Sequence, residues 1–277
     1  MPGLGIVQRA LLLLVIAVFP FACGTSGAWI EARRTPLTIE RIERAEGEGV
    51  QAVAAAVQNR EMPHVLIYHT HTWEAYEMTE ETQYEKTETW RTKDEQYNMI
   101  RVGEALAAEL TARGFFVVHD KTAFEPPNLS SAYTRSLEML DTRKAAGEEY
   151  DYIFDVHRDA YSGSYNGANG VMMEEQRVAY VMMLVGKGTG ATGSGFDERP
   201  DWPQNLELAQ RITDEMNALL PGVARDVKIK TGRFNQHVSD GALLIEVGNN
   251  RNTLDEALAA CPVIAQAIER AHEARVR

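Results

Sequence analysis

Three mostly apolar runs, each ending in a histidine or a glutamate, constrain the fold of this chain more than any other feature. They are residues 65–68, followed by His69 and His71, residues 152–156, followed by His157, and residues 242–245, followed by Glu246. Apolar runs of this length are typical of buried strands. Sheets of buried strands present functional side chains at the strands' carboxyl ends. If the three strands are neighbours, His71, His157 and Glu246 lie close together.

Helical patterns alternate with these strands along the rest of the chain. The sequence predicts helices over residues 92–113, 131–144 and 205–220 and a last helix capped by residues 253–256. Further strands are expected at 115–119, 178–185 and 227–230, and the alternation at 227–230 is typical of an edge strand. Thr92 and Glu95 fit a capping box at the start of the first helix, and Pro262 is expected to kink or split the last one. The alternation predicts an α/β fold with a mostly parallel central sheet and helices on both faces.

Two imidazoles and a carboxylate at one sheet edge are the groups that a hydrolytic zinc site needs. Such a site takes three protein ligands and leaves a fourth position for the water that zinc acidifies. The chain has two cysteines, Cys23 and Cys261, and the first lies in an apolar N-terminal run. Neither a disulfide framework nor a cysteine zinc site can be built from them. The ligands must therefore be His, Asp or Glu.

Three segments resemble one known family when they are taken together and in order. They are residues 67–76, IYHTHTWEAY, residues 155–160, DVHRDA, and residues 244–258, which begin LIEVG. This combination resembles the stage II sporulation protein P family, which consists of membrane-tethered peptidoglycan hydrolases related to zinc-dependent N-acetylmuramoyl-L-alanine amidases. The resemblance runs from about residue 63 to about residue 267. It implies an amidase-like fold, zinc, and hydrolysis of the amide between N-acetylmuramic acid and the L-alanine of the stem peptide.

The resemblance also implies roles for single residues. His71 and His157 would bind the metal, and Glu246 would be the catalytic base. The third ligand is either Glu74, which lies within the first motif, or Asp94, which stands four residues before an asparagine as the ligand glutamate does in the related amidases. The residue-level alternative for Asp94 is a carboxylate at the start of a helix. Strand alternation would place His69 on the same face as His71, where it supports a ligand or contacts the substrate.

Four polar residues near the expected site are further candidates. Arg158 could hold a peptide carboxylate through two hydrogen bonds, and Asp159 could orient an imidazole. Asn235 and Gln236 are expected to contact the substrate peptide or the oxyanion. Two other functions remain open at this point: a zinc endopeptidase acting on stem peptides or cross-links, and a catalytically inactive wall-binding scaffold on the same fold.

The N-terminal part of the chain predicts export. Arg9 precedes the apolar residues 10–23, as in an export signal. We expect residues 1–30 to be a signal or membrane anchor, 31–62 a stalk or linker, and 63–277 the peptidoglycan amidase domain at the outer face of the cytoplasmic membrane. Small residues at 22–28 offer a cleavage site as the alternative, and Cys23 a lipid attachment site.

The charge of the chain bears on its partners. The formal net charge is −12, and a chain of this charge would repel nucleic acid. The expected partners are peptidoglycan, the cytoplasmic membrane through the N-terminal segment, and other wall-remodelling proteins.

Overall fold

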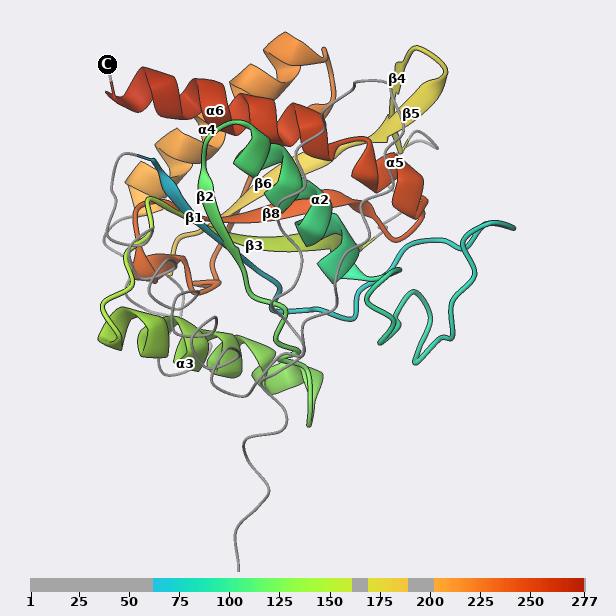
Figure 1. The fold of residues 1–277 in the computed structure, drawn as a ribbon, viewed down its shortest axis with the longest axis horizontal. Coiled ribbons are helices and arrows are strands. Elements are labelled where there is room, and N and C mark those ends of the chain that lie inside the picture. The colour runs from blue at the N-terminus through green and yellow to red at the C-terminus, as the bar shows by residue number, and fades with distance from the viewer. Residues whose placement is uncertain (1–61, 161–168, 189–201, 277) are drawn as a thin grey trace, which may run out of the picture. The chain divides into compact units, whose positions relative to one another are not determined.

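Six strands form one sheet in the order β2-β1-β3-β8-β6-β7 (Figure 1). The strands are β1 (His64–Tyr68), β2 (Phe116–His119), β3 (Tyr152–Asp159), β6 (Val181–Gly186), β7 (Ala224–Lys230) and β8 (Ala242–Asn249). Neighbouring strands run parallel except β6 and β8, which are antiparallel. The expectation of a mostly parallel sheet is confirmed, and β7 lies at its edge as predicted. The computed structural model describes residues 62–160, 169–188 and 202–276.

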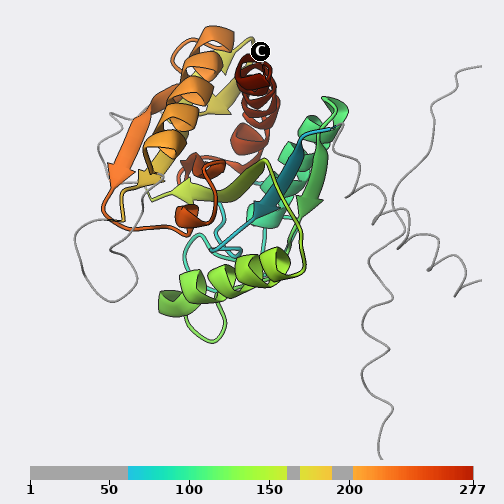
Figure 2. The same cartoon turned by 90° about the vertical axis from the view of Figure 1, so that its left-hand side faces the viewer.

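Helices cover both faces of the sheet unequally (Figures 1 and 2). One face carries α2 (Met99–Ala112), α4 (Trp202–Leu219), α5 (Leu254–Leu258) and α6 (Cys261–Val276), and the other carries α3 (Ala132–Ala145). Alternate residues of β1 serve the two faces. Val65 and Ile67 belong to the large core under α2, α4 and α6, whereas Leu66 and Tyr68 belong to a smaller cluster with Leu140 of α3. Because both faces are buried, the strand is apolar after His64.

The predicted strand over residues 178–185 is two strands in the structure. Residues up to Ala179 belong to β5 (Gln176–Ala179), which pairs with β4 (Gly170–Met173) in a separate antiparallel hairpin. Tyr180 separates β5 from β6, and its carbonyl accepts from the Gly248 N–H at the end of β8. The apolar run therefore passes from one sheet to the next, which periodicity alone does not indicate.

Two helix starts tested the capping predictions. Thr253 and Glu256 form a complete capping box at the start of α5. The predicted last helix is divided between Leu258 and Cys261 into α5 and α6, and Pro262 is the second residue of α6. The box at Thr92 was wrong, since α2 begins at Met99. Its cap is Asn98, whose side-chain oxygen accepts from the Ile100 N–H.

Residues 1–61, which make up the predicted anchor (1–30) and all but the last residue of the predicted stalk (31–62), lie outside the residues that the structure describes. Within 62–160, 169–188 and 202–276, no helix is both long enough and apolar enough to cross a membrane.

Candidate metal and catalytic site

The strands that end in functional residues are neighbours in the sheet. β3 lies between β1 and β8, and all three run in the same direction. His157 pairs in register with Glu246. The ring centroids of His71 and His157 are 5.3 Å apart, with the rings nearly perpendicular. The chain thus brings His71, His157 and Glu246 to one end of the sheet, as the sequence predicted.

The site lies on the face of the sheet that carries α3. His157 alternates with Val156, which belongs to the core on the opposite face, and Glu246 likewise alternates with Ile245. The His71 ring contacts the ring of Tyr133 on α3 at a centroid distance of 5.6 Å. All three functional side chains therefore meet under α3.

His69 faces away from this site, so the prediction that it shares a face with His71 was wrong. The strand ends at Tyr68, and a turn follows in which the Glu74 N–H donates to the His71 carbonyl at 3.1 Å. Strand alternation does not extend through a turn. His69 is fully buried on the α2 side, with Nδ1 2.8 Å from the Val156 carbonyl oxygen. It cannot contact a substrate there.

The contacts of His69 fix the protons of a buried histidine pair. The Val156 carbonyl can only accept, so Nδ1 of His69 carries the proton and Nε2 accepts. The partner at Nε2 is the Nε2 of His119, 2.8 Å away, which must then be the donor. Burial lowers the pKa of His69 to about 4 and that of His119 to about 3. Both rings are neutral near pH 7 and act as packing groups between α2 and the sheet.

Glu74 is the acidic residue that the structure brings to the histidines. Its Oε2 lies 3.5 Å from Nδ1 of His157, and its Oε1 lies 3.5 Å from Nη1 of Arg158. Burial alone would raise the pKa of Glu74, but Arg158 and His157 outweigh burial and lower that pKa to about 2. Asp94, the other candidate, is exposed, and its Oδ1 accepts from the Gln96 N–H at 3.0 Å. The alternative role of Asp94, a carboxylate at the start of a helix, is not met either, because Asp94 lies in a turn and α2 begins at Met99.

Arg158 is committed to its own chain. Besides the ion pair with Glu74, its Nε donates to the Ala75 carbonyl at 3.2 Å and its Nη2 to the Trp90 carbonyl at 3.4 Å. The prediction that it holds a peptide carboxylate is therefore not supported by its placement. Its guanidinium instead fixes Glu74 and the segment that follows Glu74.

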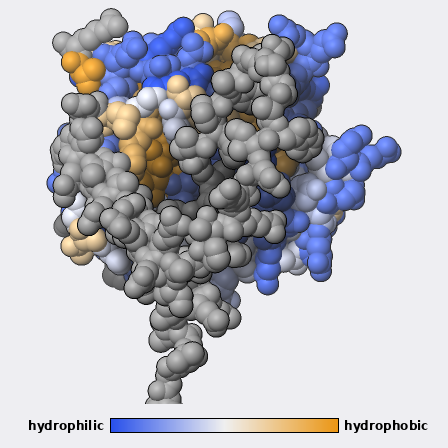
Figure 3. Space-filling model, in the orientation of Figure 1, coloured by the Kyte–Doolittle hydropathy of each residue, from blue (hydrophilic) through white to orange (hydrophobic). Residues whose placement is uncertain are grey.

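A projecting loop follows this anchored segment. Residues 77–90 extend at the right of Figure 1, and the same place in Figure 3 is hydrophilic. The loop is closed at its base, where the Ala75 N–H donates to the Trp90 carbonyl at 2.8 Å. Its exposed glutamates are Glu77, Glu80, Glu81, Glu85 and Glu88. An acidic surface therefore flanks the candidate site.

Glu246 sits in an environment that brings its pKa close to neutral. Its Oε2 is buried and has no hydrogen-bond partner. Burial is the largest cause that raises the pKa of Glu246 to about 8, and the nearby carboxylates of Glu74 and Asp159 raise it further, against the opposing charge of His157. A carboxyl group with a pKa close to neutral can exchange a proton at working pH.

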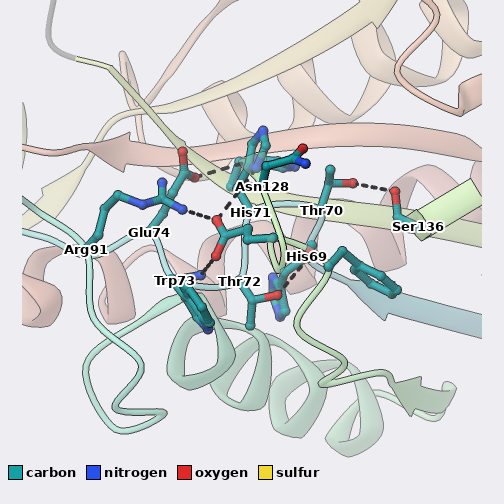
Figure 4. Close-up of polar contacts among 12 residues, drawn as sticks. His69, Thr70, His71, Thr72, Trp73, Glu74, Arg91, Asn128 and Ser136 are labelled. Atoms are coloured by element: carbon teal, nitrogen blue, oxygen red, sulfur yellow. Dashed lines mark hydrogen bonds and ion pairs between the residues drawn. The ribbon is translucent and has the colours of Figure 1, made fainter. Parts of the chain in front are cut away.

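Two carboxylates near the imidazoles were missed by sequence reasoning. Oδ1 of Asp155 lies 2.7 Å from Nε2 of His157, and Oε1 of Glu125 lies 3.7 Å from Nδ1 of His71. Asp155 was detectable, because residues two apart in a strand share a face. Glu125 comes from the loop between β2 and α3, and no periodic signal marks it. Glu125 also accepts from the Trp73 N–H and pairs with Arg91, two residues that Figure 4 shows beside His71.

The remaining predicted substrate contacts are structural in their placement. Nδ2 of Asn235 donates to the Tyr133 carbonyl and to Oγ of Ser136, which ties the loop before β8 to α3. The Gln236 side chain accepts from the Gly186 N–H and donates to the Leu184 carbonyl, which closes the end of β6. Both side chains are almost fully buried, so the expectation that they meet the substrate was wrong.

Asp159 does not orient His157. Its Oδ1 accepts from the Ala160 N–H at 2.9 Å, and its Oδ2 lies 4.0 Å from Nζ of Lys228. The carboxylate in contact with the imidazole is Asp155, on the same face as His157.

Comparison with known proteins identifies the family. The model of the family described as stage II sporulation protein P matches residues 33–269. The chain belongs to this family. It is 26% identical over 203 residues to stage II sporulation protein P of Bacillus subtilis strain 168, a match covering 69% of this chain and 47% of that protein. The chain thus spans about half the length of the curated relative that it matches.

Solved structures with some likeness to this member of the family are more distant. The CwlD amidase from Clostridioides difficile, solved in complex with the GerS lipoprotein, is 14% identical, with a TM-score of 0.49, and the match covers 77% of this chain and 98% of that one. The catalytic domain of CwlV, an N-acetylmuramoyl-L-alanine amidase from Bacillus (Paenibacillus) polymyxa var. colistinus, is 14% identical with a TM-score of 0.45, covering 78% and 98%. Neither likeness is close enough to transfer residue roles.

The nitrogen and oxygen atoms of the candidate site can be compared with the ligand geometry that zinc requires. In the described residues, no group of three or more His, Cys, Asp or Glu side chains already has a metal-binding arrangement. The pair formed by His157 Nδ1 and Glu74 Oε2 nevertheless fits, because their 3.5 Å separation exceeds a normal hydrogen bond and is close to the roughly 3.4 Å between two ligands of tetrahedral zinc. Nδ1 of His71 is also buried without a hydrogen-bond partner, an uncommon state for a buried polar atom.

Proposed function

We propose that the chain is a zinc-dependent peptidoglycan hydrolase that cleaves the amide between N-acetylmuramic acid and the L-alanine of the stem peptide. The observation that carries the proposal is the meeting of His71, His157, Glu74 and Glu246 at the carboxyl ends of β1, β3 and β8, on the face under α3. Membership of the stage II sporulation protein P family and the amidases named above support this choice of substrate.

In this proposal, His71, His157 and Glu74 hold the metal. Zinc, when bound, supplies an acidified water and a polarised carbonyl. Glu246 takes a proton from the water molecule as the water oxygen attacks the carbonyl carbon. Glu246 then returns the proton to the amide nitrogen as the carbon–nitrogen bond breaks. No covalent enzyme intermediate is needed. Arg158 keeps Glu74 in place and ionised throughout.

The first test measures metal content. The purified full-length chain is expected to bind about one zinc per molecule, as an open catalytic site does. His157→Ala and Glu74→Ala should each lower zinc affinity strongly, because each removes a ligand. Asp94→Ala is the matched control: it removes an exposed carboxylate from the same stretch of chain and should leave affinity unchanged. Equal zinc content in wild type and His157→Ala would reject the site.

The products of digestion separate the proposed bond from the endopeptidase alternative. The amidase releases stem peptides whose free N-terminus is alanine. An endopeptidase would instead leave alanine attached to muramic acid and expose amino groups within the peptide.

A further inference from the structure

His157 lies between two carboxylates. Nδ1 faces Oε2 of Glu74 at 3.5 Å, and Nε2 faces Oδ1 of Asp155 at 2.7 Å. Asp155 and His157 are both almost fully buried. The contact at Nε2 is short but not well aligned as a hydrogen bond. The two ring nitrogens therefore have separate partners, and the ring cannot rotate without losing both.

Asp155 is the end point of a directed chain of hydrogen bonds. Its Oδ1 accepts from the Thr70 N–H at 2.8 Å, and its Oδ2 accepts from the Thr70 hydroxyl at 2.7 Å. Because the Thr70 hydroxyl gives its only proton to Asp155, the 3.0 Å contact with Ser136 (Figure 4) requires the Ser136 hydroxyl to donate to Thr70, in competition with the Tyr133 carbonyl at 3.3 Å. Ser136 in turn accepts from Nδ2 of Asn235 at 3.0 Å. With the shorter Ser136–Thr70 contact made, the chain of donors from Asn235 leads to Asp155, an order in which the bonds polarise one another and favour an ionised carboxylate.

This network decides which nitrogen of His157 is free. An ionised carboxylate oxygen 2.7 Å from Nε2 repels a lone pair there, so the neutral His157 ring carries its proton on Nε2. The lone pair is then on Nδ1, the nitrogen that faces Glu74. Zinc ligands of this kind commonly donate their other N–H to a carboxylate, which fixes the ring and raises its basicity as a ligand.

We propose that Asp155 is a positioning residue that presents Nδ1 of His157 to the metal, with Thr70, Ser136 and Asn235 holding Asp155 in turn. The inference rests on the proposed zinc site. It also assigns a purpose to Asn235, which would act on the site through three other side chains and without touching the substrate.

The test compares two buried aspartates in the full-length chain. Asp155→Asn keeps the shape and removes the charge, and it should weaken zinc affinity about 10- to 100-fold. Asp120→Asn is the control, because Asp120 is also buried but pairs with Arg143 at 2.7 Å and does not contact His157. Asp120→Asn should bind zinc within about twofold of wild type, because substitutions that do not contact one another's partners have nearly independent effects. Affinity is measured by competition with a chelator.

Two further readings separate positioning from general stability. Zinc should raise the melting temperature of Asp155→Asn less than that of wild type, since stabilisation by a ligand follows its affinity. In the cobalt-substituted protein, the visible absorption of Asp155→Asn should differ from wild type. A purely structural role would lower the melting temperature of the metal-free and the metal-bound protein equally and leave the spectrum unchanged.

Thr70 gives a second pair of variants if Asp155→Asn does not fold. Thr70→Val removes the hydroxyl and should lower zinc affinity. Thr70→Ser keeps the hydroxyl and should bind zinc with wild-type affinity. Wild-type affinity in folded Asp155→Asn, or in Thr70→Val where Asp155→Asn does not fold, would overturn the inference and leave the zinc site standing. A wild-type protein that binds no zinc would overturn both.

Discussion

Glu246 is the residue whose role can be tested most directly. It stands on β8 beside His157, and its buried Oε2 has no hydrogen-bond partner. Glu246→Gln keeps the size and shape and removes the proton acceptor. We expect release of stem peptides from purified peptidoglycan to fall by about 10²-fold or more. Zinc content should stay at the wild-type level, because the proposed ligands are unchanged.

The exposed Glu95→Gln is the control for this substitution and should leave turnover unchanged. Turnover of Glu246→Gln near that of wild type would contradict its assignment as the base. Loss of zinc together with activity would make Glu246 a ligand, and Glu74 would then lose that role.

At the residue scale, the sequence indicated the side chains that end strands and missed those that act through the fold. His71, His157 and Glu246 were predicted because each follows an apolar run, although β3 and β8 continue beyond His157 and Glu246. Asp94 could not be separated from Glu74, since the distance of either from His157 depends on the turn after β1. Asn235 is polar and lies before a functional strand, which made it resemble a substrate contact. Only the three-dimensional structure shows that its side-chain amide donates to the Tyr133 carbonyl and the Ser136 hydroxyl.

At the element scale, α2 owes its approach to the sheet to one glycine. A Cβ at Gly103 would lie 2.5 Å from Nε2 of His69 and 2.5 Å from Nε2 of His119. Alanine is the better helix former by about 1 kcal/mol, but overpacking costs about 1–3 kcal/mol. The His69 ring cannot easily yield, because it is bonded to the Val156 carbonyl. Gly103→Ala should therefore lower the free energy of unfolding, measured by denaturant titration.

Two comparisons test the cause of this loss. Ala108→Gly, at an exposed position of the same helix, gives the helix propensity alone and should cost about 1 kcal/mol. His119→Ala removes one of the crowded rings, so Gly103→Ala should cost less in that background, as a double-mutant cycle would report. A Gly103→Ala protein more stable than wild type would show that the rings move aside.

The elements themselves were predictable where one pattern served one structure. The mostly parallel sheet followed from the apolar runs, and the edge strand β7 followed from its alternation. The capping box of α5 followed from Thr253 and Glu256. The pattern failed where a signal was shared. Thr92 and Glu95 have the spacing of a capping box without a helix behind them, and His69 and His71 have the spacing of one strand face although a turn divides them.

At the scale of the whole molecule, the net charge bears on the proposed substrate, and the N-terminal segment bears on the proposed location. The net charge is −12, and the loop of residues 77–90, which follows Glu74, carries exposed glutamates. Such a surface opposes binding to nucleic acid and leaves an uncharged glycan strand unaffected. This is compatible with the proposed wall substrate.

The last prediction concerns the N-terminal segment. Arg9 precedes the apolar residues 10–23, and apolar character continues nearly to Ile30, about the length of 20 residues that spans a bilayer. Exposing these apolar side chains to water costs free energy, and the segment avoids this cost if it stays in the membrane. We therefore expect an uncleaved anchor with the catalytic domain on the outer face. Fractionation of cells that express the full chain should place it with the cytoplasmic membrane, released by detergent and not by salt. External protease should degrade the domain in cells whose wall has been removed. Recovery of a soluble form that begins between Gly24 and Trp29 would instead indicate cleavage and a secreted enzyme.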